Sequence, residues 1–298
     1  MTSLHRLGEL YTAAQDVATG RTKIELVSLA DTTTWHMDQA IRKLTAVLED
    51  GDTTPLADLV SCARSLRWIL LTEPFPVRHS ITRAERTRDL TALVTRCAHT
   101  VAATLHGTLH ELVSLAESAR AEAVPPAGEL LLQSLDEIGW ADCVAVLAST
   151  RAAHGTQKWF EELGLSVPVA SVRQHARLDV HDSAFYIGPP SLFGPAVTTA
   201  PRARNITYIF GSWVRDRSLP RTNIAAYAEG ASTLRPRLYE VGDQPRPRST
   251  PPQPEPTLYP EPVWRPAPSE RAPRPDDVMA RQVLLGGGCR SCSTPTGN

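Results

Sequence analysis

The chain has 298 residues, of which 42% are hydrophobic and 21% charged, and its formal net charge is −1. These values are typical of a globular protein and exclude a fully disordered chain and a small disulfide-stapled scaffold. No apolar run approaches the roughly 20 residues that a membrane span needs, and the N-terminus lacks a signal-peptide core. We therefore expect a cytoplasmic protein without a membrane partner.

The first part of the chain, residues 1–124, has the apolar periodicity of helices and predicts a small bundle. The expected helices cover about residues 3–19, 31–49, 54–73 and 82–123. Thr54-Pro55 supplies an N-cap followed by proline, and Thr82 with Glu85 has the spacing of a capping box. The intervening segment 22–30 is short, and its pattern assigns it to no element.

The second part, residues 125–243, alternates helical segments with short apolar runs. The runs cover residues 143–148, 167–170, 184–187, 206–210 and 237–241, and the helices about 127–138 and 152–163. This pattern is typical of strands that are buried on both faces of a parallel sheet. The expected fold class is therefore α/β, with a helical N-terminal region and a small Rossmann-like domain whose sheet is mostly parallel.

The last part of the chain is rich in proline. Twelve of the 25 prolines lie between Pro245 and Pro275, so we interpret residues 244–275 as a disordered, extended linker. Residues 276–298 regain a short apolar pattern and then end in a segment rich in Cys, Ser, Thr and Pro. Because a linker normally connects two folded parts, we interpret 276–298 as a truncated or unstructured tail, and the reading frame as truncated or frameshifted.

Polar side chains follow the expected strands. In open α/β sheets ligands bind beyond the carboxyl ends of the strands. The candidate ligand-binding residues there are Ser149, Thr150, Arg151, Arg173, His175 and Ser191. Hydroxyls, two guanidinium groups and an imidazole suit an anionic ligand, although loops are also polar simply because they meet water. The chain has neither a P-loop nor a G-x-G-x-x-G motif.

An arginine-rich stretch suggests a second kind of site. Five arginines with one acidic residue lie between residues 202 and 221, interleaved with Tyr208, Phe210 and Trp213. Such a stretch can contact a nucleic-acid backbone. The candidate nucleic-acid-binding residues are Arg202, Arg204, Arg215, Arg217 and Arg221. The alternative is that Tyr208 and Phe210 alternate as strand residues and one face of the stretch is core.

Two metal-like patterns favour ordinary explanations. His99, His106 and His110 fall on one face of the expected long helix, but away from its apolar stripe, so a solvated polar face explains them better than a metal site. Cys289 and Cys292 form a lone pair without the second pair that structural zinc needs. We expect no metal, no cofactor and no identifiable catalytic residue.

The order of several segments resembles a known family. These segments are 144–151, 184–190, 197–203 and 213–217, with 278–288 resembling the start of a further module. Together they are similar to the E component of the actinobacterial DISARM anti-phage defence system. The resemblance covers roughly residues 75–288 and carries no catalytic motif.

Three functions follow as hypotheses. The resemblance implies a non-catalytic accessory component of a bacterial phage-defence complex that contacts nucleic acid or partner proteins of that complex. The strand-end loops favour a nucleotide- or anion-binding α/β enzyme domain instead. The proline-rich segment is compatible with a third function, an interaction scaffold.

Overall fold

The structure is a computed structural model that describes Gly8, Thr12, residues 15–16, and residues 21–49, 54–121, 123–199, 201–220 and 236–242. The chain divides into two units, Met1–Arg246 and Pro247–Asn298, and all described residues belong to the first. The expected linker and tail, and most of the expected first helix, therefore lie outside the described residues. Among the described helices, none is both long and apolar enough to cross a bilayer.

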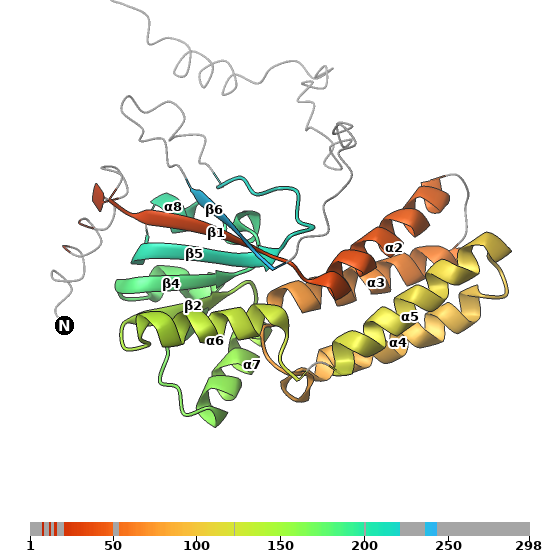
Figure 1. The fold of residues 1–298 in the computed structure, drawn as a ribbon, viewed down its shortest axis with the longest axis horizontal. Coiled ribbons are helices and arrows are strands. Elements are labelled where there is room, and N and C mark those ends of the chain that lie inside the picture. Colours follow the sequence, from red (N-terminus) through yellow and green to blue (C-terminus); the bar gives the residue numbers. More distant parts are fainter. Residues whose placement is uncertain are drawn as a thin grey trace, which may run out of the picture. The chain divides into compact units, whose positions relative to one another are not determined.

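The described strands form one six-stranded sheet in the order β3-β2-β4-β5-β1-β6 (Figure 1). The strands are β1 (Lys23–Leu29), β2 (Cys143–Leu147), β3 (Val169–Ser171), β4 (His181–Ile187), β5 (Ala203–Gly211) and β6 (Arg237–Val241). Every two neighbouring strands of the sheet run parallel to each other. This confirms the α/β class and all five strands expected after residue 125.

Strand side chains alternate between two cores, one on each face of the sheet. In β2, Ala145 and Leu147 belong to one core, whereas Val144 and Val146 belong to the other. The first core is covered by α6 (Pro126–Ile138) and α7 (Thr150–Glu162), and the second by the 3-10 helix η3 (Val172–Arg177) and α8 (Ala196–Thr199). Burial on both faces explains why these strands have continuous apolar sequences.

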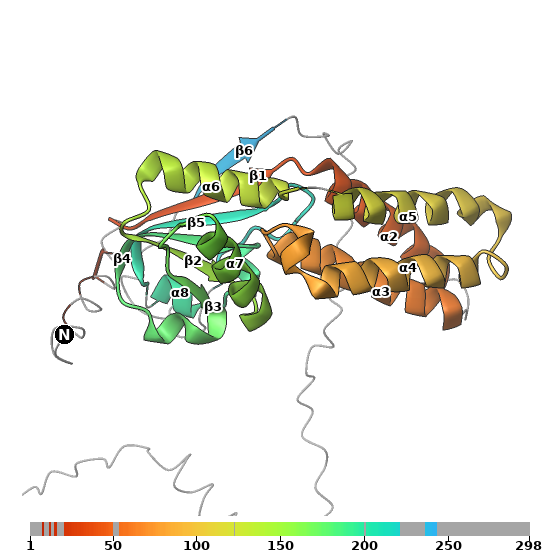
Figure 2. The same cartoon turned by 90° about the horizontal axis from the view of Figure 1, so that it is seen from below.

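A helical bundle follows β1 and precedes α6 (Figure 2). It consists of α2 (Thr32–Glu49), α3 (Thr54–Thr72), α4 (Ile81–Cys97) and α5 (His106–Ala121), and these helices share a core of their own. Residues 1–124 are not entirely helical, however, because β1 lies inside the sheet between β5 and β6. Ile24 and Leu26 of β1 are both 4% exposed, since they pack into a sheet core.

The long helix expected over 82–123 is interrupted. The chain leaves α4 after Cys97, forms the 3-10 helix η2 (Ala103–Leu105) and returns as α5. The N-cap of α4 is Ser80, whose hydroxyl accepts a hydrogen bond from the Arg83 amide, and not the expected Thr82. Packing of α4 against α5 in the bundle core overrides the helical pattern, because only a reversal lets both apolar faces meet.

The segment between α3 and the 3-10 helix η1 (Val77–His79) enters the α/β part of the chain. Phe75 is 1% exposed and belongs to the core beneath α6 and α7. A Cβ atom added to Gly155 of α7 would lie 2.3 Å from Cζ of Phe75, and one added to Gly128 of α6 would lie 1.9 Å from the Pro74 carbonyl oxygen. Glycine at both positions allows this close approach, which fixes the end of α3 against α6 and α7.

Candidate functional site

The carboxyl ends of the parallel strands meet at one edge of the sheet. β3 lies on one side of β2 and β4 on the other, so the direction of the chain reverses between β2 and β4. Ligands of open α/β sheets bind at such a switch point. Residues 149–151 follow β2 and residues 188–191 follow β4, so both segments lie beside this point.

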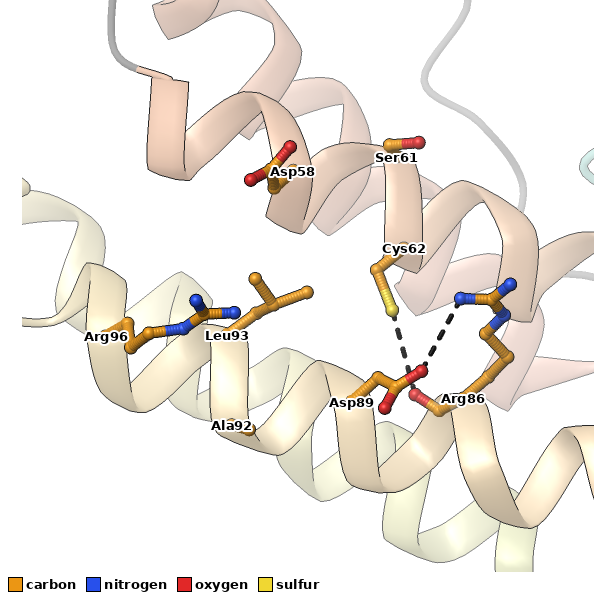
Figure 3. Close-up of a pocket in the computed structure, with 8 residues that line it drawn as sticks. All are labelled: Asp58, Ser61, Cys62, Arg86, Asp89, Ala92, Leu93 and Arg96. Carbon is orange, nitrogen blue, oxygen red and sulfur yellow. Dashed lines mark hydrogen bonds and ion pairs between the residues drawn. The ribbon is translucent and has the colours of Figure 1, made fainter.

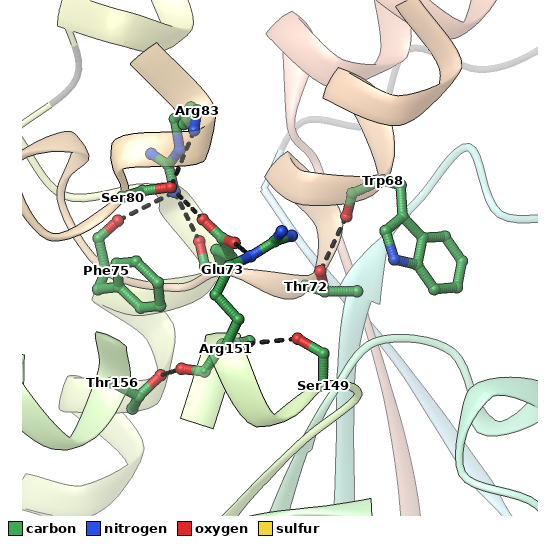
Figure 4. A network of polar contacts seen from close by, with 10 residues as sticks. Trp68, Thr72, Glu73, Phe75, Ser80, Arg83, Ser149, Arg151 and Thr156 are labelled. Carbon is green, nitrogen blue, oxygen red and sulfur yellow. Dashed lines mark hydrogen bonds and ion pairs between the residues drawn. The ribbon is translucent and has the colours of Figure 1, made fainter. Parts of the chain in front are cut away.

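Arg151 and Glu73 are joined at this edge. Nε of Arg151 lies 3.1 Å from Oε1 of Glu73, whose side chain is 1% exposed, while the side chain of Arg151 is 55% exposed. The terminal nitrogens of Arg151 make no hydrogen bond with any described residue. In Figure 4 the guanidinium extends from Glu73 towards the side on which Thr72 and Trp68 lie. A buried carboxylate thus orients an arginine whose remaining donors are available.

Hydrogen bonds hold both the Glu73 carboxylate and the backbone that follows it. The second carboxylate oxygen accepts a short hydrogen bond from the Ser80 hydroxyl. Arg83 is fully buried, and its Nη2 donates to the carbonyls of Glu73 (2.9 Å) and Phe75 (3.0 Å). Arg83 therefore ties down the backbone on both sides of Pro74, while Arg151 is the guanidinium that the Glu73 carboxylate holds.

A second arginine fixes α3 over the carboxyl ends of β1 and β5. Nη1 of Arg67 pairs with the carboxylate of Asp38 in α2, and its guanidinium lies 4.8 Å from the ring centre of Trp213, which follows β5. The Trp213 indole donates to the Thr34 hydroxyl at 2.9 Å. Burial lowers the pKa of Arg67, while Asp38 opposes that shift. Arg67 and Glu73 therefore hold the last turns of α3 at two points.

His175 does not face the candidate site. It is 4% exposed, and its Nε2 lies 3.0 Å from the Tyr186 hydroxyl. Burial, with a smaller contribution from Arg202, lowers the pKa of His175 to about 4, and burial raises the pKa of Tyr186. The imidazole is thus a neutral hydrogen-bonding group beneath the sheet.

The other candidate ligand-binding residues lie at the surface of the carboxyl edge. Thr150 is exposed at the beginning of α7, where Ser149 is the N-cap and accepts from the Ala152 amide at 3.1 Å. Arg173 after β3 and Ser191 after β4 are exposed too. The structure therefore brings five of the six candidates to one edge.

The arginine-rich stretch is not one surface. Arg202 is 7% exposed and donates to the carbonyls of Ala176 (2.7 Å) and Leu178 (3.0 Å). Arg204 begins β5 and pairs with Asp182 at 3.5 Å, whereas Arg215 and Arg217 follow the end of β5. At about 3.3 Å per residue, β5 separates Arg202 and Arg204 from Arg215 and Arg217 by more than 20 Å. Arg221 lies outside the described residues.

The groove between α3 and α4 has no excess charge. Its volume is about 280 Å³, and it is lined by Asp58, Ser61, Cys62, Arg86, Asp89, Ala92, Leu93 and Arg96 (Figure 3). Two arginines are balanced by two aspartates. Burial raises the pKa of the Cys62 thiol, which donates to the Arg86 carbonyl, so it is not a reactive thiolate.

The described residues contain no group of three or more His, Cys, Asp or Glu side chains that could hold a metal ion. His99 follows α4, whereas His106 and His110 belong to α5, so the three do not share one helix as expected. Cys289 and Cys292 lie outside the described residues.

Sequence reasoning missed Glu73, which orients Arg151. The available signal was its position directly after a helix and before Pro74, where the backbone of a residue is restricted. The sequence alone could not show that its partner lies in α7, 78 residues away.

No protein-family model and no curated protein matched the sequence. The resemblance to the E component of the DISARM system, and the defence role that it implies, therefore stay predictions.

Proposed function

We propose that this chain binds a small phosphate-bearing molecule at the carboxyl edge of its sheet, beside the switch point between β2 and β4. The observation that carries this proposal is the half-exposed guanidinium of Arg151, held through Nε by the buried Glu73 carboxylate at 3.1 Å. An arginine oriented in this way loses little conformational freedom when its terminal nitrogens bind phosphate oxygens.

The charge distribution supports the same ligand class. Arg173 adds a second exposed positive charge after β3. The loop after β4 contributes differently, because Pro189 and Pro190 have no amide hydrogen to donate and both are buried. We therefore assign the main contact with the anion to Arg151 and not to the amides of this loop.

Calorimetric titration with inorganic tripolyphosphate at low salt tests the proposal. We expect Arg151→Ala to weaken binding at least tenfold, because a charge-assisted contact is lost. Arg151→Lys should recover only part of the affinity, since lysine cannot bind Glu73 and the ligand through the same planar group.

Arg204→Ala is the matched control. Arg204 is also exposed and also pairs with a carboxylate, but it lies at the amino end of β5. Thermal unfolding of each variant separates loss of binding from loss of folding. Equal weakening by Arg151→Ala and Arg204→Ala would refute the proposal, as would the absence of any binding to the wild-type protein.

A further inference from the structure

Trp68 lies on the side of α3 that faces the sheet and yet remains exposed. Leu71 and Thr72 share its helix face, being three and four residues further along, and both are buried; Leu71 belongs to a sheet core. Trp68 is nevertheless 44% exposed. Its indole therefore borders open space beside the carboxyl edge of the sheet.

The turn of α3 that carries this indole is fixed by contacts on both sides. Arg67 pairs with Asp38 and lies over Trp213, and Glu73 binds Arg151. The Thr72 hydroxyl donates to the Trp68 carbonyl at 2.9 Å (Figure 4). Because the backbone of this turn is already held in place, stacking of the indole on a ligand orders little more than the side chain itself.

Trp68 lies close along the chain to the residue that holds the anion contact. Trp68 and Glu73 are five residues apart on a helical path, about 7.5 Å along the axis and about 140° around it, and the Glu73 amide still bonds to the Ile69 carbonyl. The Arg151 guanidinium extends from Glu73 back towards the side on which Trp68 lies (Figure 4). Glu73 holds the guanidinium that we propose as the phosphate contact. A nucleotide presents a flat base and a phosphate group separated by one sugar, and so it can reach both groups together.

From this arrangement we infer that the ligand is a nucleotide whose base stacks on Trp68 while its phosphates bind Arg151. This inference rests on the proposed function, because it assigns the base to a position next to the proposed phosphate contact. Stacking on one aromatic side chain discriminates poorly among bases, so ATP and GTP should bind with similar affinity.

The test compares ATP with tripolyphosphate, which carries the same phosphate chain without base or sugar. By calorimetry, the full-length protein should bind ATP about tenfold more tightly than tripolyphosphate. Trp68→Ala should remove this advantage and leave tripolyphosphate binding unchanged, and Trp68→Phe should retain most of it. Trp140→Ala is the matched control, because Trp140 is 45% exposed but precedes β2, at the opposite edge of the sheet.

The outcomes separate the two proposals. If the wild-type protein binds tripolyphosphate as tightly as ATP, or if Trp140→Ala weakens ATP binding as much as Trp68→Ala, the nucleotide inference is wrong and the phosphate site stands. If the protein binds neither compound, both proposals are wrong. Should Trp68→Ala not fold, an ATP-dependent change in tryptophan fluorescence that is lost in Trp68→Phe and kept in Trp140→Phe would support the inference, and its persistence in Trp68→Phe would overturn it.

Discussion

His175 shows how a polar residue after a strand can serve the core instead of a ligand. The 3-10 helix η3 turns the imidazole under the sheet, where it meets the Tyr186 hydroxyl at 3.0 Å. Arg202 fixes the same helix by donating to the carbonyls of Ala176 and Leu178. His175 and Arg202 thus belong to one buried polar cluster, although the sequence assigned them to separate binding sites.

This burial makes the stability of the protein depend on pH. The pKa of His175 falls from 6.5 to about 4 on folding, so below pH 6.5 the unfolded state takes up a proton that the folded state resists. The contribution of His175 to the free energy of unfolding is complete above pH 6.5. It is lost as the pH falls towards 4, and the loss is about 3 kcal/mol for this single group. Urea unfolding at several pH values should show that His175→Gln, which keeps a partner for Tyr186, loses less stability than the wild type over this range. If the stability of the two proteins changed with pH in parallel, the pH dependence would not come from His175.

At the scale of elements, the segment from Glu73 to Pro76 is the connection that positions the candidate site. Phe75 packs beneath α6 and α7, and Glu73 reaches Arg151 at the beginning of α7. Glu162 pairs with Arg78 at 3.2 Å and lies 3.1 Å from Nε2 of His79, and these contacts hold the other end of α7 against η1. A shift of this segment would therefore displace the guanidinium that we propose as the anion contact.

Gly155→Ala tests this packing. The new Cβ would lie 2.3 Å from the buried Phe75 ring, and we expect a net loss of about 1–2 kcal/mol in unfolding free energy, because overpacking exceeds the gain in helix propensity. Gly107→Ala in α5 is the matched control, since nothing lies within 4 Å of its new Cβ, and it should be neutral or stabilising by up to about 1 kcal/mol. Chemical denaturation measures both changes, and an equal effect of the two substitutions would show that Phe75 readily moves aside.

Elements with strong local signals could be predicted from the sequence, whereas those defined by distant contacts could not. The apolar runs of β2 and β4 identify buried strands because both of their faces are covered. β1 has no such run, since Glu25 and Ser28 interrupt its apolar residues, and only pairing with β5 identifies it as a strand. The break after Cys97 contains neither proline nor glycine, so no local residue marks it. For the same reason the sequence indicated Arg151, which follows a strand, but not its partner Glu73.

At the scale of the whole molecule, the bundle and the sheet differ in how they depend on the rest of the chain. The core of α2 to α5 draws all its residues from positions 37–119. The sheet instead needs β1, which pairs with both β5 and β6, as well as Leu71 and Phe75 from the end of α3 and its following segment. A division of the chain at residue 124 therefore leaves the bundle whole and takes an interior strand from the sheet.

Expression of the two parts tests this dependence. Residues 31–124 should form a helical fragment that unfolds cooperatively, because every side chain of its core is present. Residues 125–243 should not, because loss of β1 removes Ile24, Leu26 and Leu29 from the core, at about 2 kcal/mol each, and this sum is comparable to the stability of a whole domain. Residues 21–243 are the control and should unfold cooperatively. Circular dichroism during urea titration distinguishes the cases, and cooperative unfolding of 125–243 alone would mean that β1 only borders a sheet that is stable without it.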